Sequence, residues 1–159
     1  MPPTKSVEQV LKAKRIEEIT TPKLVQASPD ISVKDGIDLM QNSRAGYIVV
    51  AKNKKVAGIF TENDVINKIL DKDVDWNRPI SDFMTADPPV LKPTDLVGRA
   101  IDVMGEKRVY HIPLVDDKGE LVNVLSVRTL TRFLAEFYPT EIYNLPPRPD
   151  QIMPTQEGG

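Results

Sequence analysis

The chain has 159 residues, 40% of them hydrophobic, which is long enough for one compact unit with its own apolar core. The formal net charge is −2 at pH 7 and the Lys and Arg residues are scattered, which argues against a nucleic-acid partner. Because Cys is absent and His occurs once, zinc sites, disulfides and thiol catalysis are excluded, and we expect no metal site.

The sequence predicts neither a secretion signal nor a membrane span. The N-terminal stretch MPPTKSVEQVLKAK lacks the apolar core of about 7 to 15 residues that a signal peptide carries. No run of about 18 apolar residues occurs in the chain. We therefore expect a cytoplasmic protein that does not enter a membrane.

The first predicted element is a helix over about residues 7–18. Ser6 and Gln9 have the spacing of a capping box, in which each side chain bonds the backbone N–H of the other residue. This arrangement predicts that the helix begins directly after Ser6.

An internal repeat follows this helix. Shifting the chain by 64 residues aligns SPDISVKDGIDLMQNSRAGYIVV with KPTDLVGRAIDVMGEKRVYHIPL, and ten positions between residues 16 and 54 are identical, Ile16/Ile80 and Arg44/Arg108 among them. The turn DDKGE is one residue longer than KNKK, so the shift becomes 65 beyond it, a difference that a hairpin loop tolerates. The two copies are therefore expected to share one fold.

Each copy is predicted to run as short strand, helix, strand, strand, helix. The first helix of each copy has apolar or small residues at i, i+3, i+4 and i+7: Val33, Gly36, Ile37 and Met40, then Val97, Ala100, Ile101 and Met104. The small residues among them predict close packing. The strand pairs are YIVVA with VAGIF, and IPLVD with LVNVLS. The second helices carry Val65, Ile66, Ile69 and Leu70, then Leu130, Phe133, Leu134 and Phe137.

We divide the chain into an N-terminal helical segment (1–14), a first motif (15–72), a linker (73–79), a second motif (80–138) and a tail (139–159). Trp76 in the linker is interpreted either as an anchor on the folded unit or as a dimer contact. The tail holds five prolines, which forbid a helix, so we expect it to be extended.

The order of these elements, with GIFTENDV closing the first copy, DFMTADPPVLKP between the copies and HIPLVD in the second, resembles a tandem pair of cystathionine-β-synthase (CBS) domains, a Bateman module. The resemblance covers about residues 15–137. It implies an α/β (α+β) fold in which two β-α-β-β-α motifs, with small sheets packed by helices, are related by a pseudo-two-fold axis. It also implies two clefts, regulatory binding of adenine nucleotides or adenosyl ligands, and a flat homodimer formed through helix faces, with Leu39, Phe133 and Phe137 as candidate shared residues.

The stretch Thr61-Glu-Asn-Asp64 joins a strand to a helix and has two interpretations. Thr61 can cap the helix while Asp64 favours the positive end of its dipole. Asp is short for the capping-box position, however, which prefers Glu or Gln. Within the repeat we favour a second role, in which Asp64 accepts both ribose hydroxyls and Thr61 adds a hydroxyl. The two roles are compatible.

The resemblance implies that an adenine wall from the second copy faces Asp64. By this carry-over the wall consists of Val90, Tyr110, His111, Ile112 and Pro113. Backbone groups near Val90 and Ile112 are expected to form hydrogen bonds with the polar edge of the adenine. Ile59 and Pro113 are expected to pack on its two faces. Arg128 is expected to reach the phosphate, with His111 as a second donor.

The second cleft is expected to bind more weakly. Thr129 stands where the first copy has Asp64, and Val49 stands where the second copy has Pro113. Without the carboxylate, ribose binding should weaken tenfold or more, because such a hydrogen bond contributes about 1.5 to 3 kcal/mol. We therefore expect one principal nucleotide site per chain, the one that contains Asp64.

Two functions remain open. The first is a stand-alone sensor in which AMP, ADP, ATP or another adenosyl ligand alters the arrangement of the copies, or the contact with a partner protein through the N-terminal helix or the tail. The second is a structural or interaction module with empty clefts. Catalysis is not expected, because the phosphate-cradling GxxxxGK loop is absent. No cofactor is required by either function.

Overall fold

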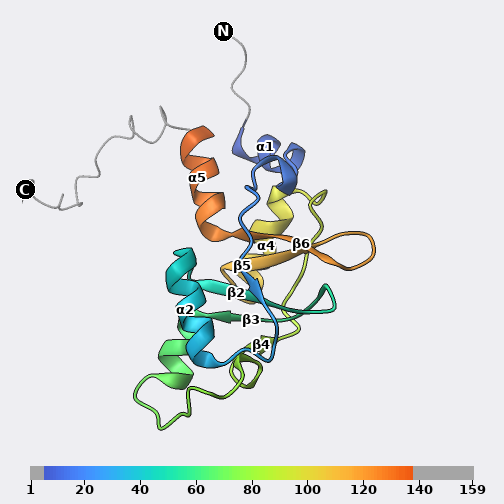
Figure 1. Cartoon of the computed structure of the whole chain (residues 1–159). Coiled ribbons are helices and arrows are strands. Elements are labelled where there is room, and N and C mark those ends of the chain that lie inside the picture. Colours follow the sequence, from blue (N-terminus) through green and yellow to red (C-terminus); the bar gives the residue numbers. More distant parts are fainter. Residues whose placement is uncertain (1–5, 138–159) are drawn as a thin grey trace, which may run out of the picture.

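The computed structural model describes residues 6–137, and of Phe137 only the backbone (Figure 1). The predicted tail (139–159) lies outside the described residues. The helices are α1 (Val7–Ala13), α2 (Val33–Ser43), α3 (Glu62–Asp64), α4 (Val97–Lys107) and α5 (Val127–Phe137). The strands are β1 (Gln26–Ala27), β2 (Tyr47–Lys52), β3 (Lys55–Thr61), β4 (Thr85–Ala86), β5 (His111–Val115) and β6 (Leu121–Ser126). Single 3₁₀ turns form at Ile16–Glu18 and Ile80–Asp82, and a π turn forms at Val65–Ile69.

The N-terminal helix begins as predicted and ends earlier. Ser6 Oγ accepts the Gln9 N–H at 3.2 Å, and Gln9 Oε1 accepts the Ser6 N–H at 3.1 Å, so the capping box is confirmed. The helix stops at Ala13, because Lys14 turns to extended backbone and its carbonyl accepts the Val97 N–H at 2.9 Å. The prediction that it continues to residue 18 is therefore wrong, since a contact with a distant segment redirects the chain.

Helices α2 and α4 follow the predicted periodicity. The buried positions are Val33, Gly36 and Met40 in α2, and Val97, Ala100 and Met104 in α4. The expected close packing at Gly36 is confirmed, because a Cβ there would lie 2.9 Å from Ile80 Cγ2. Both helices end on an arginine in left-handed backbone, Arg44 (φ 52°) and Arg108 (φ 53°). The repeat therefore extends to the helix caps.

The two predicted strand pairs form antiparallel hairpins, β2–β3 and β5–β6. The first belongs to a sheet with the order β1-β2-β3-β4, in which β1 runs parallel to β2. The second copy has a single parallel bridge at the same place, Leu91 with Leu114. Val49 N–H donates to the Val25 carbonyl at 2.9 Å, whereas its counterpart Pro113 has no N–H, which shortens the second ladder.

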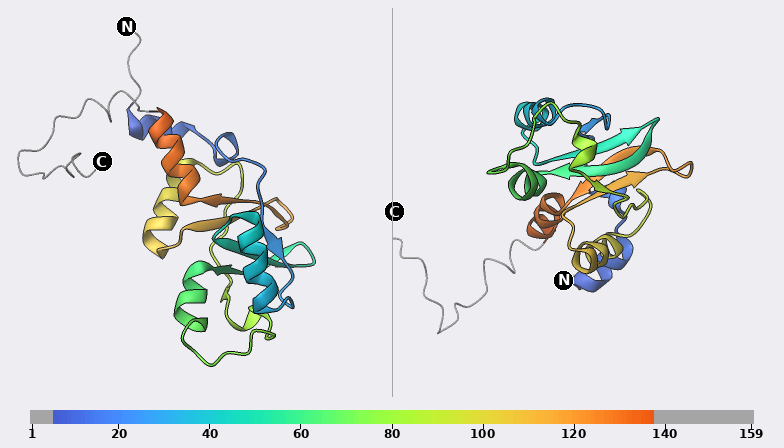
Figure 2. Two further views of the ribbon diagram at one scale, coloured as in Figure 1. Left: turned by 60° about the vertical axis from the view of Figure 1, so that its left-hand side comes forward. Right: turned by 90° about the horizontal axis from the view of Figure 1, so that it is seen from below.

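The opening segment of each copy packs into the other copy. Ile16 N donates to the Asp95 carbonyl at 2.9 Å, and its repeat equivalent Ile80 N donates to the Ile31 carbonyl at 2.8 Å. Ile16 is fully buried in the core of the second motif, and Ile80 is fully buried in the core of the first. Figure 2 shows the consequence, with α1 lying beside α4 and the two hairpins facing each other between the helices. Each motif thus inserts its opening segment into the core of the other motif.

The second helix of the first copy departs from regular α geometry. After α3 the chain forms a π turn, in which Leu70 N donates to the Val65 carbonyl at 2.8 Å. Of the four predicted apolar positions Ile69 is buried, whereas Ile66 is 59% exposed and Leu70 is also exposed. The predicted helix is therefore present, but its buried face is narrower than expected.

The residues named for a dimer contact lie in different environments. Leu39 packs against the first core and Phe133 against the second. The Trp76 ring is exposed, while its carbonyl accepts the Lys34 N–H at 3.1 Å. Within residues 6–137 no helix has the length and apolar character to cross a bilayer, and no group of acidic, His or Cys side chains is placed to hold a metal ion.

Candidate functional site

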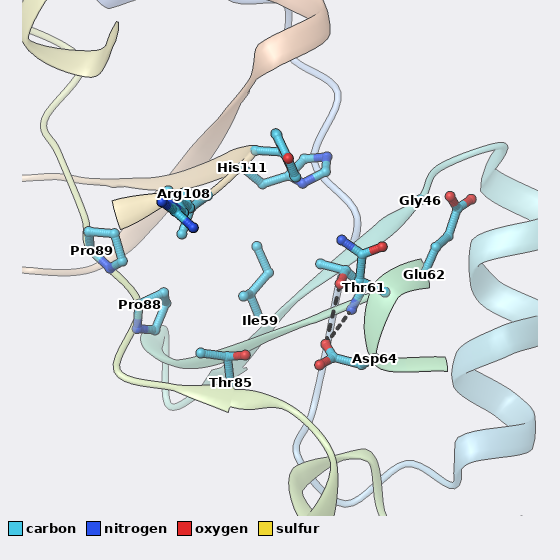
Figure 3. A pocket seen from close by; sticks show the side chains of 13 residues that line it. Gly46, Ile59, Thr61, Glu62, Asp64, Thr85, Pro88, Pro89, Arg108 and His111 are labelled. Carbon is cyan, nitrogen blue, oxygen red and sulfur yellow. Dashed lines mark hydrogen bonds between the residues drawn. The ribbon is translucent and has the colours of Figure 1, made fainter. Parts of the chain in front are cut away.

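A cavity of about 450 Å³ lies between the two motifs (Figure 3). The first motif contributes the end of β3 and the start of α3, and the second contributes the segment between α4 and β5. The β4 segment, which pairs with β3, adds a third side. Its lining residues are Gly46, Ile59, Thr61, Glu62, Asn63, Asp64, Thr85, Pro88, Pro89, Arg108, Val109, Tyr110 and His111.

Asp64 is the buried polar side chain of this cavity, with 7% of its surface exposed. Its Oδ2 accepts the Thr61 N–H at 2.9 Å and faces Thr61 Oγ1 at 3.4 Å, as Figure 3 shows. Asp is therefore long enough to reach back to the cap N–H, and the argument from its short length is wrong. A carboxylate on a single methylene therefore closes the capping-box bond, and Asp64 caps the helix from the cleft wall.

Lys68 holds the other oxygen of Asp64. Its Nζ lies 2.8 Å from Asp64 Oδ1 and donates to the Phe83 carbonyl at 2.7 Å. The ammonium thus ties the carboxylate to the segment that precedes β4. Lys68 was not among the predicted site residues, although its position four residues after Asp64 favours such an ion pair. The second copy has Phe133 at this position, so the arrangement belongs to one cleft.

The wall that faces Asp64 differs from the predicted one. Ile59, Tyr110 and His111 line the cavity as expected, but Val90, Ile112 and Pro113 do not. Ile112 and Pro113 are buried in β5, where they pair with β6, and the Pro113 carbonyl accepts the Leu91 N–H at 3.2 Å. Val90 is 41% exposed outside the cavity. Their places are taken by Pro88, Pro89 and Val109, which lie on the loops at either end of the same wall.

The arginine of this cavity is Arg108 and not Arg128. Arg108 is the left-handed residue that ends α4, and it lines the cavity. Arg128 lies in the first turn of α5 and lines two neighbouring cavities instead. The identity of Arg44 and Arg108 in the repeat was the signal that could have identified this position.

His111 lies at the junction of two cavities and lines both. Its ring contacts the Tyr47 ring, with centroids 4.7 Å apart. Burial disfavours the charged imidazolium and lowers the pKa of His111 to about 4. The ring is therefore neutral at pH 7, so it can donate one hydrogen bond to a phosphate but supplies no charge.

The second cavity, of about 380 Å³, is the repeat equivalent of the first. In place of the Thr61–Asp64 pair it has Ser126 and Thr129, whose hydroxyls lie 3.1 Å apart, and the Thr129 N–H donates to Ser126 Oγ at 3.2 Å. It is lined by Thr21, Lys23, Arg44, Ala45, Gly46, Tyr47, His111, Val124, Ser126, Arg128, Thr129 and Arg132. This cleft caps its helix with hydroxyls, and no residue between 6 and 137 places a carboxylate on its wall.

The fold and the two related clefts agree with a comparison to known protein families, in which residues 16–71 and 80–136 each match the CBS domain. The chain belongs to the CBS domain family. Its two CBS motifs together account for most of the chain. The opening turns at Ile16 and Ile80 fall inside the matched stretches.

Relatives by sequence include a short protein and a longer enzyme. A 17.7 kDa protein from Acidianus ambivalens, described as uncharacterized, is 27% identical over 127 residues, which are 79% of this chain and 76% of that protein. Inosine-5'-monophosphate dehydrogenase from Methanocaldococcus jannaschii is 31% identical over 127 residues. That match covers 79% of this chain and only 25% of the dehydrogenase, so the chain spans about a quarter of such relatives.

Solved structures share the fold. A CBS domain protein from Pyrobaculum aerophilum complexed with AMP has a TM-score of 0.69 at 23% identity, over 79% of this chain and 99% of that one. A CBS domain pair in complex with 5'-methylthioadenosine and S-adenosyl-L-methionine has a TM-score of 0.70 at 16% identity, over 77% and 97% of the two chains. These likenesses establish the architecture of the CBS pair.

Proposed function

We propose that the protein is a regulatory module that binds an adenine nucleotide or a related adenosyl ligand in the cavity at Asp64. The observation that carries the proposal is a carboxylate buried to 7% exposure on the wall of a 450 Å³ cavity between two CBS motifs. The cavity size lies within the usual range for small-molecule sites. The relatives solved with AMP and with S-adenosyl-L-methionine support this class of ligand.

Asp64 has the free acceptor capacity that a ribose needs. A carboxylate offers about four lone-pair sites, of which the Thr61 N–H and the Thr61 hydroxyl occupy two on Oδ2 and the Lys68 ammonium occupies one on Oδ1. One site remains on Oδ1, and a second becomes available on Oδ2 when the long 3.4 Å bond from the Thr61 hydroxyl is exchanged for one from a ribose hydroxyl. Because Lys68 and Thr61 already fix the carboxylate, little rotamer entropy is lost on binding.

The rest of the cavity suits a flat base and an anionic tail. Ile59, Pro88, Pro89 and Val109 offer apolar surface to an adenine ring. Arg108 lines the cavity, where a guanidinium can pair with a phosphate or a carboxylate. We therefore place the base against the prolines and the charged end of the ligand toward Arg108.

Occupancy can be transmitted because the cavity belongs to both motifs. A ligand that bonds Asp64 and Arg108 links β3 and α3 of the first motif to the end of α4 in the second. Such a ligand favours the arrangement of the two motifs in which both contacts are made. A partner protein that contacts both motifs would therefore bind this arrangement and the free one with different affinities. Self-association through helix faces remains a prediction that sedimentation velocity would measure.

The first test is a thermal melt with AMP, ADP, ATP and S-adenosylmethionine. A ligand at about 100 times its dissociation constant should stabilise the fold by about 2.7 kcal/mol and raise the midpoint by roughly 5 to 10 °C. Calorimetric titration of the ligand found in this way is then repeated with Asp64→Asn. Loss of a charge-assisted hydrogen bond should weaken binding about tenfold or more.

The matched control is Asp82→Asn. Asp82 also accepts from a cation four residues away, Arg78 Nε at 3.0 Å, but it lies outside the cavity. Binding that falls in Asp64→Asn and is retained in Asp82→Asn supports the proposal. Flat melts with all four ligands would reject it and favour the alternative, an interaction module with empty clefts.

A further inference from the structure

The second cavity gathers positive charge. Among the described residues that line it, none is Asp or Glu and four are cationic: Lys23, Arg44, Arg128 and Arg132. They come from three parts of the fold, namely the segment before β1, the end of α2 and the first two turns of α5. The charge therefore arises from tertiary convergence and not from a run of basic residues in the sequence.

The repeat shows how far the two clefts have diverged in charge. Arg44 has an arginine counterpart, Arg108, at the first cavity. The other three cations replace neutral or acidic residues: Lys23 stands at the position of Asp87, Arg128 at that of Asn63 and Arg132 at that of Asn67. Thr129 in addition replaces the carboxylate of Asp64. Every one of these differences makes the second cleft more positive than the first.

These cations have no counter-ion in the part of the chain that the structure describes. None of the four side chains forms an ion pair or a hydrogen bond with another residue between 6 and 137. All four are exposed at the cavity, so an anion from solvent can reach them. Like charges that converge without partners repel one another, and a bound anion removes that repulsion.

The neutral groups of the cavity also suit an anion. The first turn of α5, an eleven-residue helix, is capped here by Ser126 and directs the positive end of its dipole to the same space. The Ser126 and Thr129 hydroxyls bond each other, which leaves one O–H free, and this O–H and one ring N–H of neutral His111 add hydrogen-bond donors. In the described part of the chain no carboxylate lines this cavity to accept the two hydroxyls of a ribose.

We propose that the second cavity binds a compact anion with two or more linked phosphate groups and does not require a ribose. Its volume of about 380 Å³ accommodates such a group. Four cations on three elements match the several oxygens of an oligophosphate better than one monovalent anion. The site is separate from the adenosyl site proposed above, so the inference goes beyond that function. Because Gly46 and His111 line both cavities, the phosphates can belong to a free ion or to the tail of a nucleotide seated at Asp64.

The test is calorimetric titration of inorganic pyrophosphate into the full chain in buffer without divalent cations. We expect one ion per chain, with binding that weakens as salt is added. Arg128→Gln combined with Arg132→Gln removes two cations from α5 and retains residues of good helix propensity, and it should weaken binding at least tenfold. The charge-matched control is Arg99→Gln with Lys107→Gln on α4, outside both cavities, which should change binding less than twofold.

The outcomes separate this inference from the proposed function. The inference would be overturned if pyrophosphate did not bind at concentrations up to about 5 mM, or if both double variants lost pyrophosphate affinity equally. This holds whether or not AMP binds. AMP is titrated separately, so its failure with pyrophosphate binding retained would reject only the adenosyl site. If the α5 variant lost its cooperative melt, Arg44→Gln at the end of α2 would provide the same test.

A second arm identifies the source of the phosphates. If the tail of a nucleotide fills the cavity, the α5 variant should weaken ATP binding about tenfold while AMP binding is retained, and ATP should compete with pyrophosphate. If the ligand is a free ion, ATP affinity should be the same in the variant and pyrophosphate should bind alongside AMP. Either result supports an oligophosphate site, because both require the same cations.

Discussion

Tyr47 and His111 occupy the same position in the two repeats, and their rings contact each other with centroids 4.7 Å apart and planes inclined at 32°. Each begins the first strand of a hairpin, β2 for Tyr47 and β5 for His111. The contact therefore lies where the two motifs meet. Since His111 also lines both cavities, its protonation affects the junction of the clefts.

Acid should destabilise the fold through His111 before it protonates most carboxylates. The folded-state pKa of about 4 lies below the unfolded value of about 6.5, so the unfolded chain binds more protons between these values. Stability is complete above pH 6.5 and declines as the pH falls toward 4. Urea unfolding should give a free energy about 2 kcal/mol lower at pH 5 than at pH 8 from this residue.

His111→Phe isolates that contribution, because it keeps an aromatic ring against Tyr47 and removes the titrating nitrogens. The variant should lose less stability than the wild type between pH 8 and pH 5. Equal pH dependence of the two proteins would show that His111 is not the group responsible.

Ile16→Ala should destabilise the protein as strongly as Ile80→Ala, although Ile16 precedes the first hairpin by some thirty residues. Each side chain is fully buried in the core of the opposite motif. We expect each substitution to lower the free energy of unfolding by about 2 to 5 kcal/mol in urea. Ile66→Ala is the control, because this side chain is exposed and should cost less than about 0.5 kcal/mol. If Ile16→Ala lowered the free energy of unfolding only slightly while Ile80→Ala lowered it strongly, the burial of Ile16 in the core of the second motif would be contradicted.

Gly58→Ala and Gly105→Ala should have opposite effects on stability. A Cβ on Gly58 would lie 2.7 Å from the carbonyl oxygen of Thr85, so β4 would have to move away from β3. We expect a loss of about 1 to 3 kcal/mol, and weaker ligand binding because Thr85 lines the first cavity. Gly105 lies in α4 with nothing within 4 Å of the new atom, so alanine there should stabilise by about 0.5 to 1 kcal/mol. Thermal melts of both variants test the contrast.

Lys68→Met should destabilise the protein more than Lys12→Met does. Both lysines pair with a carboxylate four residues earlier, Lys68 with Asp64 at 2.8 Å and Lys12 with Glu8 at 2.6 Å. Asp64 is buried, and the Lys68 variant leaves its Oδ1 without that partner, so we expect a loss of about 1 to 2 kcal/mol after allowing for the partly exposed ammonium. The Lys12 pair is exposed on both sides and should contribute less than about 0.5 kcal/mol. Equal effects in chemical denaturation would argue against a structural role for Lys68 at the cleft.

Elements that depend on local spacing were predictable. Val33, Gly36 and Met40 mark the buried face of α2, and Ser6 with Gln9 mark the start of α1, because helical periodicity and capping involve residues three or four positions apart. The hairpins were equally readable from β-rich runs joined by short polar turns. Local rules failed where a distant segment intervened, as at Lys14, whose bond to Val97 ends α1 early.

The candidate site was predictable from the residues at the end of β3 and uncertain in its opposite wall. Thr61 ends β3 and Asp64 lies in the short helix that follows, so their place could be predicted from the chain order. The opposing residues depend on how the second motif is rotated against the first. Pro88, Pro89 and Arg108 line the cavity, whereas Ile112 and Pro113 are buried in β5, where they pair with β6 of their own motif.

The sequence by itself determined the repeat, the order of helices and strands and the position of Asp64 between a strand and a helix, since these rest on short-range spacing. Only the tertiary structure decided that Ile16 is buried in the core of the second motif and Ile80 in the core of the first. It also decided that Lys68 pairs with Asp64 and that four cations line the second cavity. The physical reason is that the hydrophobic effect is non-directional. An apolar side chain is stabilised by burial in any apolar core, so its sequence does not specify which core it enters. The backbone hydrogen bonds of Ile16 to Asp95 and of Ile80 to Ile31 join residues far apart in the sequence, and they select the partner only once the chain has folded.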